Sequence, residues 1–409
     1  MKKRKLIGII CLSMAFFSTG CGNHTTDSTA DNTVTEDNEN NLNNDTNEEY
    51  TNSIDNNHSE LDTLFDRDDI LTGYTIITPY TQIILATDGT VLAKGINNYG
   101  QLGNGQRTDS ETWSQVDNLN DIVQICNLGS LGDEPNDENG FGHCYALTSS
   151  GKLYRWGGNI LTPELVFPDL TITEFKSLTS NKLFIRCESG ENYLICARPG
   201  LYADDSVFSY ASLSNTDELY GSYGGGFFLK SGDVLSYVDV ASIGYSDSFY
   251  AIAPIEDKIN NIIPINTSEK IKNIFPCVYN GFGSAVLLTD SGSIIGIECK
   301  GGETTIDNQG GSNIKKAFFG NTNFQLFQNG QLITSGDNEY GQLGDGTTIA
   351  YDDGFLEIND SLFSDFEYYD WPNKYCIAID SQYNIWGWGK GLSSTPQIIV
   401  ENSEFVHNN

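Results

Sequence analysis

The stretch Gly95-Ile-Asn-Asn-Tyr-Gly-Gln-Leu-Gly-Asn-Gly105 returns late in the chain as Gly336-Asp-Asn-Glu-Tyr-Gly-Gln-Leu-Gly-Asp-Gly346. Both copies read G-x-N-x-Y-G-Q-L-G-x-G and start 241 residues apart (336 − 95). Glycine tolerates positive φ, so a stretch this rich in it is typical of a tight loop between strands. We interpret each copy as a scaffold loop, and the spacing between the copies as a measure of a repeat.

A simpler unit recurs through the chain from about Ile70 to Val400: an apolar run, a short turn and a second apolar run. The seven turns are Asp88-Gly89, Ser150-Gly151, Ser189-Gly190, Ser231-Gly232, Ser291-Gly292, Asn329-Gly330 and Ser381-Gln382. The two long copies belong to the first and sixth units, so each unit takes about 48 residues, a period typical of propellers. Four short strands with their turns fill such a unit.

A longer segment, Gly140-Phe-Gly-His143-Cys-Tyr-Ala-Leu-Thr-Ser-Ser-Gly151-Lys-Leu-Tyr-Arg-Trp156-Gly157, follows the pattern G-x-x-H-x-x-A-L-x-x-x-G-x-x-x-x-W-G. With the two glycine-rich copies, it resembles the regulator of chromosome condensation repeat family. The resemblance spans residues 70–400 and is weaker in units three to five. It implies an all-β, seven-bladed β-propeller of four-stranded blades; six blades stay open if one middle unit is misread.

The chain ends suggest how the ring closes. The last unit stops after Thr395–Val400, one or two strands short, and Ile70–Ile77 precedes the first unit without a place in it. We expect the N-terminal strand to complete the last blade, because this would pair both exposed edges.

The N-terminus has the features of an export signal. Lys2-Lys-Arg-Lys5 precedes the twelve-residue apolar run Leu6–Phe17, which is too short to span a bilayer. Small residues then lead to Cys21, and this ending resembles a bacterial lipoprotein signal, although the family prefers Leu where Ser18 stands. The resemblance implies removal of residues 1–20 and lipid attachment at Cys21; cleavage without lipid is the alternative.

We expect residues 21–65 to form a disordered tether, 66–402 the propeller and 403–409 a tail. The tether is rich in Asn, Asp and Thr and has no Lys or Arg, so it cannot bury enough apolar surface to fold. The chain would then face outward from the cell membrane, held only by the lipid at Cys21. Its net charge of −33 opposes nucleic acid as a partner.

The cysteines do not form a recognisable framework. Without Cys11 and Cys21 seven remain, at irregular spacing and with no C-x-x-C, which fits neither a disulfide scaffold nor a zinc site. Four lie in apolar runs, where free thiols pack as small hydrophobes: Cys144, Cys187, Cys196 and Cys376. One or two disulfides stay open.

No pattern for catalysis, a cofactor or a metal was found. His143 is the only internal histidine of the repeat region, and we interpret it as structural. The chain has no nucleophile elbow, no H-E-x-x-H and no phosphate loop. The acidic segment Asp133–Gly140 lacks the alternating ligand spacing of a calcium loop.

One set of loops precedes the first apolar run of each unit, and we interpret them as joining one unit to the inner strand of the next. A ring would gather them on one face, where aromatic side chains often anchor a protein partner. The candidate residues are Tyr80, Phe141, Tyr223, Tyr279, Phe319 and Trp371. The alternative is that they plug the channel or pack between blades.

These observations predict a monomeric cell-surface lipoprotein that binds a protein or peptide without catalysis. Two alternatives are a glycan hydrolase, which needs paired carboxylates at the channel mouth, and a structural envelope component. The best-known member of the repeat family promotes nucleotide exchange on a nuclear GTPase. We do not transfer that activity to an exported, acidic chain.

Overall fold

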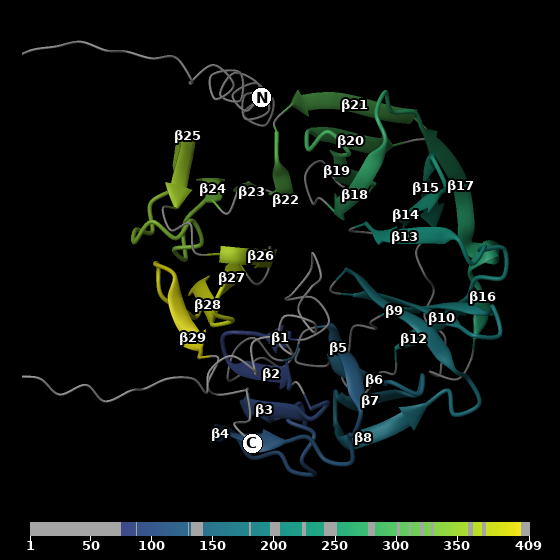
Figure 1. Ribbon diagram of the computed structural model, residues 1–409, viewed down its shortest axis with the longest axis vertical. Helices are drawn as coiled ribbons and strands as arrows, with labels where there is room; N and C mark the ends of the chain where they lie inside the picture. Colours follow the sequence, from purple (N-terminus) through teal and green to yellow (C-terminus); the bar gives the residue numbers. More distant parts are fainter. Residues whose placement is uncertain are drawn as a thin grey trace, which may run out of the picture.

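The computed structural model describes residues 75–86, 88–129, 131, 142–179, 181–196, 205–222, 226–240, 252–276, 283–300, 303–310, 312–319, 323–328, 331–358, 363–369 and 374–401. The predicted signal peptide, Cys21, the predicted tether, the Asp133–Gly140 segment and the predicted tail lie outside these residues. The described strands form seven sheets around a central axis, which confirms a seven-bladed propeller (Figure 1).

Blade 1 has β1 (Thr75–Ile77), β2 (Thr81–Leu85), β3 (Val91–Gly95) and β4 (Ser110–Gln115); blade 2 has β5 (Ile122–Leu128), β6 (His143–Thr148), β7 (Leu153–Gly157) and β8 (Ile160–Val166). Blade 3 has β9 (Ile172–Thr179), β10 (Lys182–Cys187), β11 (Asn192–Cys196) and β12 (Ser206–Ser209); blade 4 has β13 (Asp217–Gly221), β14 (Phe227–Ser231), β15 (Val234–Val240) and β17 (Ile259–Ile265).

Blade 5 has β18 (Ile271–Pro276), β19 (Ser284–Thr289), β20 (Ile294–Lys300) and β21 (Glu303–Gly310); blade 6 has β22 (Ile314–Phe319), β23 (Asn323–Gln328), β24 (Gln331–Gly336) and β25 (Tyr351–Ile358). Blade 7 has β26 (Phe363–Tyr369), β27 (Tyr375–Asp380), β28 (Ile385–Gly389) and β29 (Gln397–Val400). The short β16 (Ala253–Pro254) adds parallel to β12, and η1 (Ile255–Lys258) is a 3₁₀ turn. No helix in the described part of the chain is long and apolar enough to cross a membrane.

Within each blade the four main strands pair in chain order and antiparallel, with the first strand innermost (Figure 1). Each predicted turn lies between the second and third strands, as in the pairing of Leu85 with Val91. One apolar cluster fills each of the seven seams between neighbouring blades. A middle strand therefore packs on both faces, and this is why β6 is buried along its whole length and reads as a continuous apolar run.

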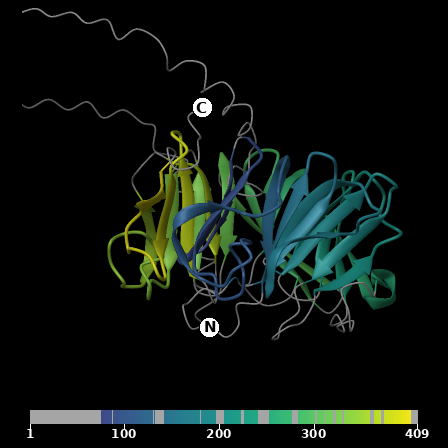
Figure 2. The same cartoon turned by 90° about the horizontal axis from the view of Figure 1, so that it is seen from below.

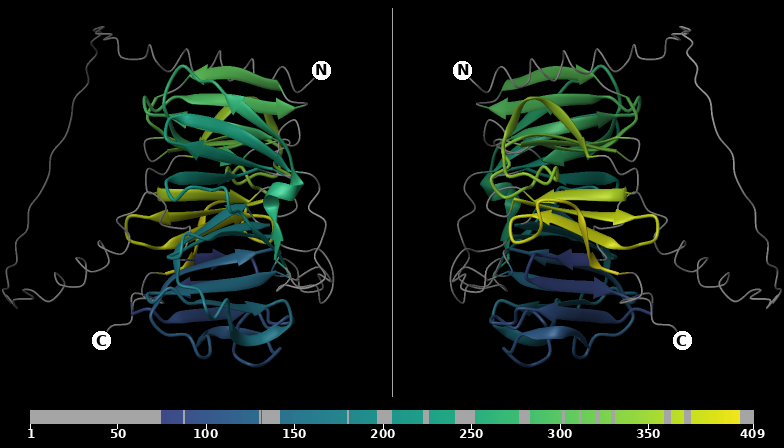
Figure 3. Two further views of the ribbon diagram at one scale, coloured as in Figure 1. Left: turned by 90° about the vertical axis from the view of Figure 1, so that its right-hand side faces the viewer. Right: turned by 90° about the vertical axis from the view of Figure 1, so that its left-hand side faces the viewer.

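The predicted ring closure was wrong. β1 pairs with β2 in blade 1, through Thr75 and Ile84, and blade 7 has four strands of its own. The sequence interpretation missed β26, an inner strand with the polar residues Ser364, Asp365 and Glu367. The first and last blades lie side by side (Figure 3), and the ring closes through side-chain packing between them instead of a shared strand.

The glycine-rich stretch has the scaffold role that its composition predicted. It lies between β3 and β4, where Asn97 Oδ1 accepts the Leu102 N–H at 2.9 Å and Asn97 Nδ2 donates to the Thr108 carbonyl at 3.2 Å. Trp156 of blade 2 donates its indole N–H to the Gln101 carbonyl at 2.9 Å. The stretch therefore holds its own loop and joins two blades.

The second copy repeats this arrangement between blades 6 and 7. Asn338 Oδ1 accepts the Leu343 N–H at 2.9 Å, and the Trp388 indole donates to the Gln342 carbonyl at 3.3 Å. Equivalent side chains thus make equivalent contacts in both copies of the stretch.

The described cysteines are free and buried, as predicted for the four in apolar runs. They are Cys126, Cys144, Cys187, Cys196, Cys299 and Cys376. Cys277 lies outside the described residues.

Candidate functional site

Two sets of connections in each blade open on the same face of the ring. Because successive strands are antiparallel, the connection from the first to the second strand and that from the third to the fourth begin at the same end of the blade. We call this end the binding face. Figure 2 shows the ring from the side, with the strands running between the two faces.

The candidate aromatic residues were assigned to connections between units, and this assignment was wrong. Their segments join the innermost strand of a blade to the second strand of the same blade, as Thr78–Tyr80 joins β1 to β2. The error has the same cause as the missed β26: each blade begins one strand earlier than its most apolar run. The segments still open on one face.

The structure places only one of the six aromatic side chains. Tyr80 is half-buried at the binding face in blade 1. Phe319 is the last residue of β22, and the structure describes its backbone but not its side chain. The other four, Phe141, Tyr223, Tyr279 and Trp371, lie outside the described residues.

Tyr80 lines a pocket of about 330 Å³ that opens on the binding face. The β1–β2 and β3–β4 connections and the adjoining strand ends form it. Its lining residues are Pro79, Tyr80, Gln82, Lys94, Gly95, Ile96, Asp109, Ser110 and Glu111. We call it the Tyr80 pocket.

The Tyr80 pocket lies on the side of blade 1 that faces blade 7. Gln82 pairs with Lys94 across β2 and β3, and side chains alternate along a strand, so both share a face with Ile84. Ile84 belongs to the apolar cluster between blades 1 and 7. At the rim, a Cβ atom on Gly391 of blade 7 would lie 2.8 Å from Pro79. The pocket is therefore built at the seam where the ring closes.

The polar groups of this pocket are mainly acceptors. Gln82 Oε1 is buried and accepts no hydrogen bond from any described residue. Asp109 Oδ1 accepts the Asn97 N–H at 2.8 Å, and the exposed Glu111 adds a second carboxylate. Lys94 is the one cation in the lining, and its Nζ lies 4.4 Å from the centre of the Trp113 ring. The arrangement is suited to receiving N–H donors.

His143 lies in a buried network between blades 2 and 3. Its Nδ1 is 3.0 Å from Asp205 Oδ2, and the Tyr145 hydroxyl donates to the same oxygen at 2.6 Å. Burial, with the Asp205 carboxylate as a second cause, raises the pKa of Tyr145 well above its usual value. A Cβ on Gly158 would come within 2.6 Å of His143 Nε2, so the ring is packed against backbone. This geometry fits the structural role expected for His143.

Two described pairs of carboxylates are bridged by lysine. Lys316 Nζ lies 2.8 Å from Asp365 and 2.7 Å from Glu367, and Asp365 is fully buried. Lys374 Nζ lies 2.7 Å from Asp337 Oδ2 and 3.5 Å from Glu339 Oε2. A hydrolase would need accessible carboxylates that hold or transfer a proton. These pairs instead have the geometry of ties between blades 6 and 7.

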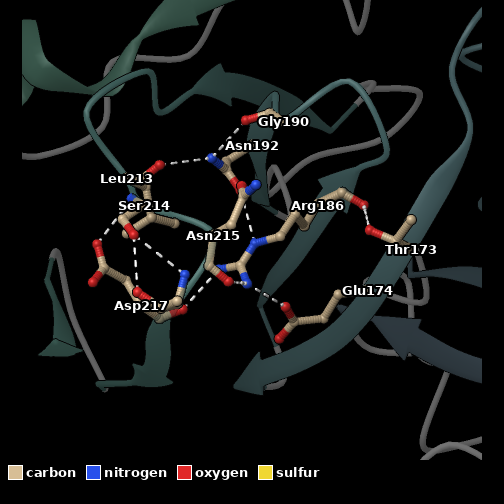
Figure 4. A network of polar contacts seen from close by, with 10 residues as sticks. Thr173, Glu174, Arg186, Gly190, Asn192, Leu213, Ser214, Asn215 and Asp217 are labelled. Atoms are coloured by element: carbon tan, nitrogen blue, oxygen red, sulfur yellow. Dashed lines mark hydrogen bonds and ion pairs between the residues drawn. The ribbon is translucent and has the colours of Figure 1, made fainter. Parts of the chain in front are cut away.

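A third polar network ties blade 3 to blade 4 on the opposite face (Figure 4). Arg186 donates to Asn192 Oδ1 at 3.1 Å and to the carbonyls of Asn215 and Asp217, each at 2.7 Å. Its guanidinium also lies 3.0 Å from Glu174. These contacts join blade 3 to the start of blade 4, so this network is a joint between blades. In the described part of the chain, no three His, Cys, Asp or Glu side chains gather in a way that could hold a metal ion.

Sequence reasoning did not single out Gln82, Lys94, Asp109 or Glu111. A signal for two of them was present, because Gln82 and Lys94 interrupt the apolar runs of β2 and β3 at positions that face each other. Asp109 and Glu111 reach the pocket because the long β3–β4 connection folds back, and their sequence positions alone give no signal for this.

The sequence matches no family model. Among solved structures, Prp20p from Saccharomyces cerevisiae superimposes with a TM-score of 0.51 and 12% identity over 84% of this chain and 90% of that chain. The structure of Kap60 bound to yeast RCC1 (Prp20) gives 0.43 with 14% identity over 73% and 77% of the two chains. Human WBSCR16 gives 0.34 with 13% identity over 70% and 67%. The similarity to Prp20p shows that the fold is an RCC1-like β-propeller, as the repeat pattern predicted.

Proposed function

We propose that this chain is a cell-surface lipoprotein whose propeller binds a protein or peptide partner without catalysis. The observation that carries the proposal is the RCC1-like ring itself. Prp20p, which shares the fold, has binding properties toward Gsp1p and histones, which are proteins. The Tyr80 pocket gives the binding face of this chain a place to hold a partner side chain.

The proposed location rests on the N-terminal sequence. The basic start, the short apolar run and Cys21 support export and lipid attachment, and residues 21–65 would hold the propeller off the membrane. The net charge of −33 favours a basic partner over nucleic acid or an anionic lipid surface. We propose a monomer, held to the membrane only by its lipid.

A site-specific crosslinker tests the binding role. We would place it in the full chain at the exposed Gln106, beside the binding face, and in a matched variant at the exposed Ser189 on the opposite face. Exposure to intact cells and secreted proteins should give a defined crosslinked partner from position 106 and none from position 189. Equal labelling from both positions, or none from either, would contradict the proposal.

Lipid attachment is tested separately. Metabolic labelling with a fatty acid should label the wild-type chain and leave a Cys21→Ala variant unlabelled and released from the membrane fraction. Retention of the label in Cys21→Ala would disprove attachment at Cys21.

A further inference from the structure

We propose that the Tyr80 pocket receives a cationic side chain, lysine or arginine, presented by the peptide or protein partner. The inference rests on the proposed binding function and adds the chemistry of recognition. Three properties of the pocket support it: an unsatisfied acceptor, its charge balance and its shape.

Gln82 Oε1 is the acceptor. Gln82 is half-buried and lines the pocket, and its Oε1 atom is buried and accepts no hydrogen bond from the described residues. Buried acceptors are nearly always satisfied, because an unmade hydrogen bond in a protein interior is unfavourable. A rotation of the Gln82 amide would turn this oxygen into the pocket, where an ammonium or guanidinium group has the N–H donors to supply the missing bond.

The charge balance favours a cation. Asp109 and Glu111 contribute two carboxylates against the single ammonium of Lys94, which is already positioned over the Trp113 ring. Only the Oδ1 oxygen of Asp109 has a hydrogen bond among the described residues, so Oδ2 can accept another. Charge-assisted bonds of this kind are stronger than neutral ones. An anionic ligand would instead have to approach both carboxylates.

The shape suits one long side chain. The pocket volume of about 330 Å³ is at the lower end of the range for ligand sites, roughly 300–1,000 Å³. Pro79, Tyr80 and Ile96 supply apolar wall, and the carboxylates stand at the β4 side. The aliphatic part of lysine or arginine can pack against such a wall while its charged end reaches the acceptors.

The probes are four capped tripeptides, glycine-X-glycine, in which X is lysine, arginine, norleucine or glutamate, and binding to the full chain is measured by calorimetry. We expect the lysine or arginine peptide to bind, and the norleucine and glutamate peptides to bind at least about tenfold more weakly. Spermidine and a glucose trisaccharide serve as probes for a free polyamine and for glycan.

The variants are Gln82→Leu and the double change Asp109→Asn with Glu111→Gln, with Glu357→Gln on the exposed outer strand β25 as the matched control. Asparagine at 109 keeps an oxygen for the Asn97 N–H, so the loop retains its hydrogen bond. Each pocket variant should lower the affinity for the cationic peptide by about tenfold or more, and Glu357→Gln should leave this affinity unchanged. Circular dichroism confirms that each variant is folded.

Several results would overturn the inference. They are equal binding of the lysine, arginine and norleucine peptides, unchanged affinity in folded pocket variants, tighter binding of spermidine than of either cationic peptide, or selective binding of the trisaccharide.

Crosslinking from position 106 distinguishes a failure of this inference from a failure of the proposed function. If crosslinking persists in the pocket variants, the partner binds without this pocket. If the peptide binds but no partner is crosslinked, the proposed function fails and the pocket chemistry remains.

Discussion

Tyr375 of the last blade donates its hydroxyl proton to the main-chain carbonyl of Ile77 in the first blade, at 3.0 Å. Both residues also belong to the apolar cluster at this seam. The ring is therefore closed by packing and a side-chain hydrogen bond, with each blade completed by its own strands. The Tyr80 pocket lies at the same seam, so the closure of the ring also positions the candidate site.

Replacing Tyr375 with phenylalanine should weaken this closure. The change leaves the buried Ile77 carbonyl without its donor, and we expect the free energy of unfolding to fall by about 1 kcal/mol. Urea denaturation measures the effect. Tyr154→Phe is the matched control, because no hydrogen bond of the half-buried Tyr154 hydroxyl is described. Equal losses in both variants would show that the Tyr375 bond does not stabilise the ring.

The scaffold role of the glycine-rich stretch predicts a sharp difference between two of its glycines. Gly103 has φ +61°, and a Cβ there would lie 2.6 Å from Val116 and 2.9 Å from Trp156. Gly105 has φ +75°, but the nearest atom to its Cβ would be 3.6 Å away. Gly103→Ala combines backbone strain with overpacking.

We therefore expect Gly103→Ala to lower the free energy of unfolding by about 2–4 kcal/mol, and Gly105→Ala by about 1 kcal/mol from strain alone. Denaturation curves of the two variants against wild type give the comparison. Similar losses would mean that the contact with Trp156 is not tight and that the stretch does not lock blades 1 and 2 together.

The middle hairpins of the blades were predictable from sequence because their strands are buried on both faces. His143–Thr148 and Tyr375–Asp380 are buried throughout, and such strands produce the runs and turns from which the repeat was counted. The inner and outer strands were harder to predict. β26 mixes aromatic residues with Ser364, Asp365 and Glu367, and β4 is polar with half of its residues exposed, so neither gives a continuous apolar run. This displaced the blade boundaries and led to the wrong closure.

The candidate site was predictable only in part. The sequence indicated that Tyr80 belongs to a loop on a shared face, because the repeat places equivalent loops together. It could not indicate the Tyr80 pocket, since Gln82 and Asp109 meet through the folding of a long connection against the seam with blade 7. Contacts of this kind follow from tertiary packing and have no periodic pattern.

The buried thiols predict a loss of stability at alkaline pH. Burial raises the pKa of Cys196 from 9.0 to about 12; the Lys182 ammonium opposes the rise and the Asp205 carboxylate adds to it. Burial raises the pKa of Cys187 and of Cys299 to about 11. Above pH 9 the unfolded chain loses thiol protons that the folded chain retains. The unfolded state then binds fewer protons, so the free energy of unfolding falls as pH rises from 9 toward 11–12.

Urea denaturation at several values between pH 8 and pH 10 should show this decline. Cys196→Ala removes one of the contributing groups, so its decline should be shallower by at most about 1.4 kcal/mol per pH unit. The slopes are compared, because the cavity left by the substitution lowers stability at every pH. An identical slope in both proteins would contradict the assignment to Cys196.

The ion group of Lys316 gives the largest predicted effect. Its Nζ lies 2.8 Å from Asp365 and 2.7 Å from Glu367, and both Lys316 and Asp365 are almost completely buried. Lys316→Met leaves the Asp365 carboxylate in the interior without this cation, which should cost about 3–5 kcal/mol of stability. The neighbouring Lys315 donates to the Ser364 carbonyl and lies 5.9 Å from the centre of the Phe327 ring, with no carboxylate among its described partners, so Lys315→Met should cost about 1 kcal/mol.

The double variant Lys316→Met with Asp365→Asn shows whether the loss comes from the charge. Replacing the Asp365 carboxylate should recover part of the stability, because an amide is less costly to bury than an anion that has lost its cation. Denaturation of both single variants and the double variant completes the cycle. If Asp365→Asn only adds to the loss, the Lys316 side chain acts through packing, and the electrostatic tie between the inner strands of blades 6 and 7 is not what stabilises them.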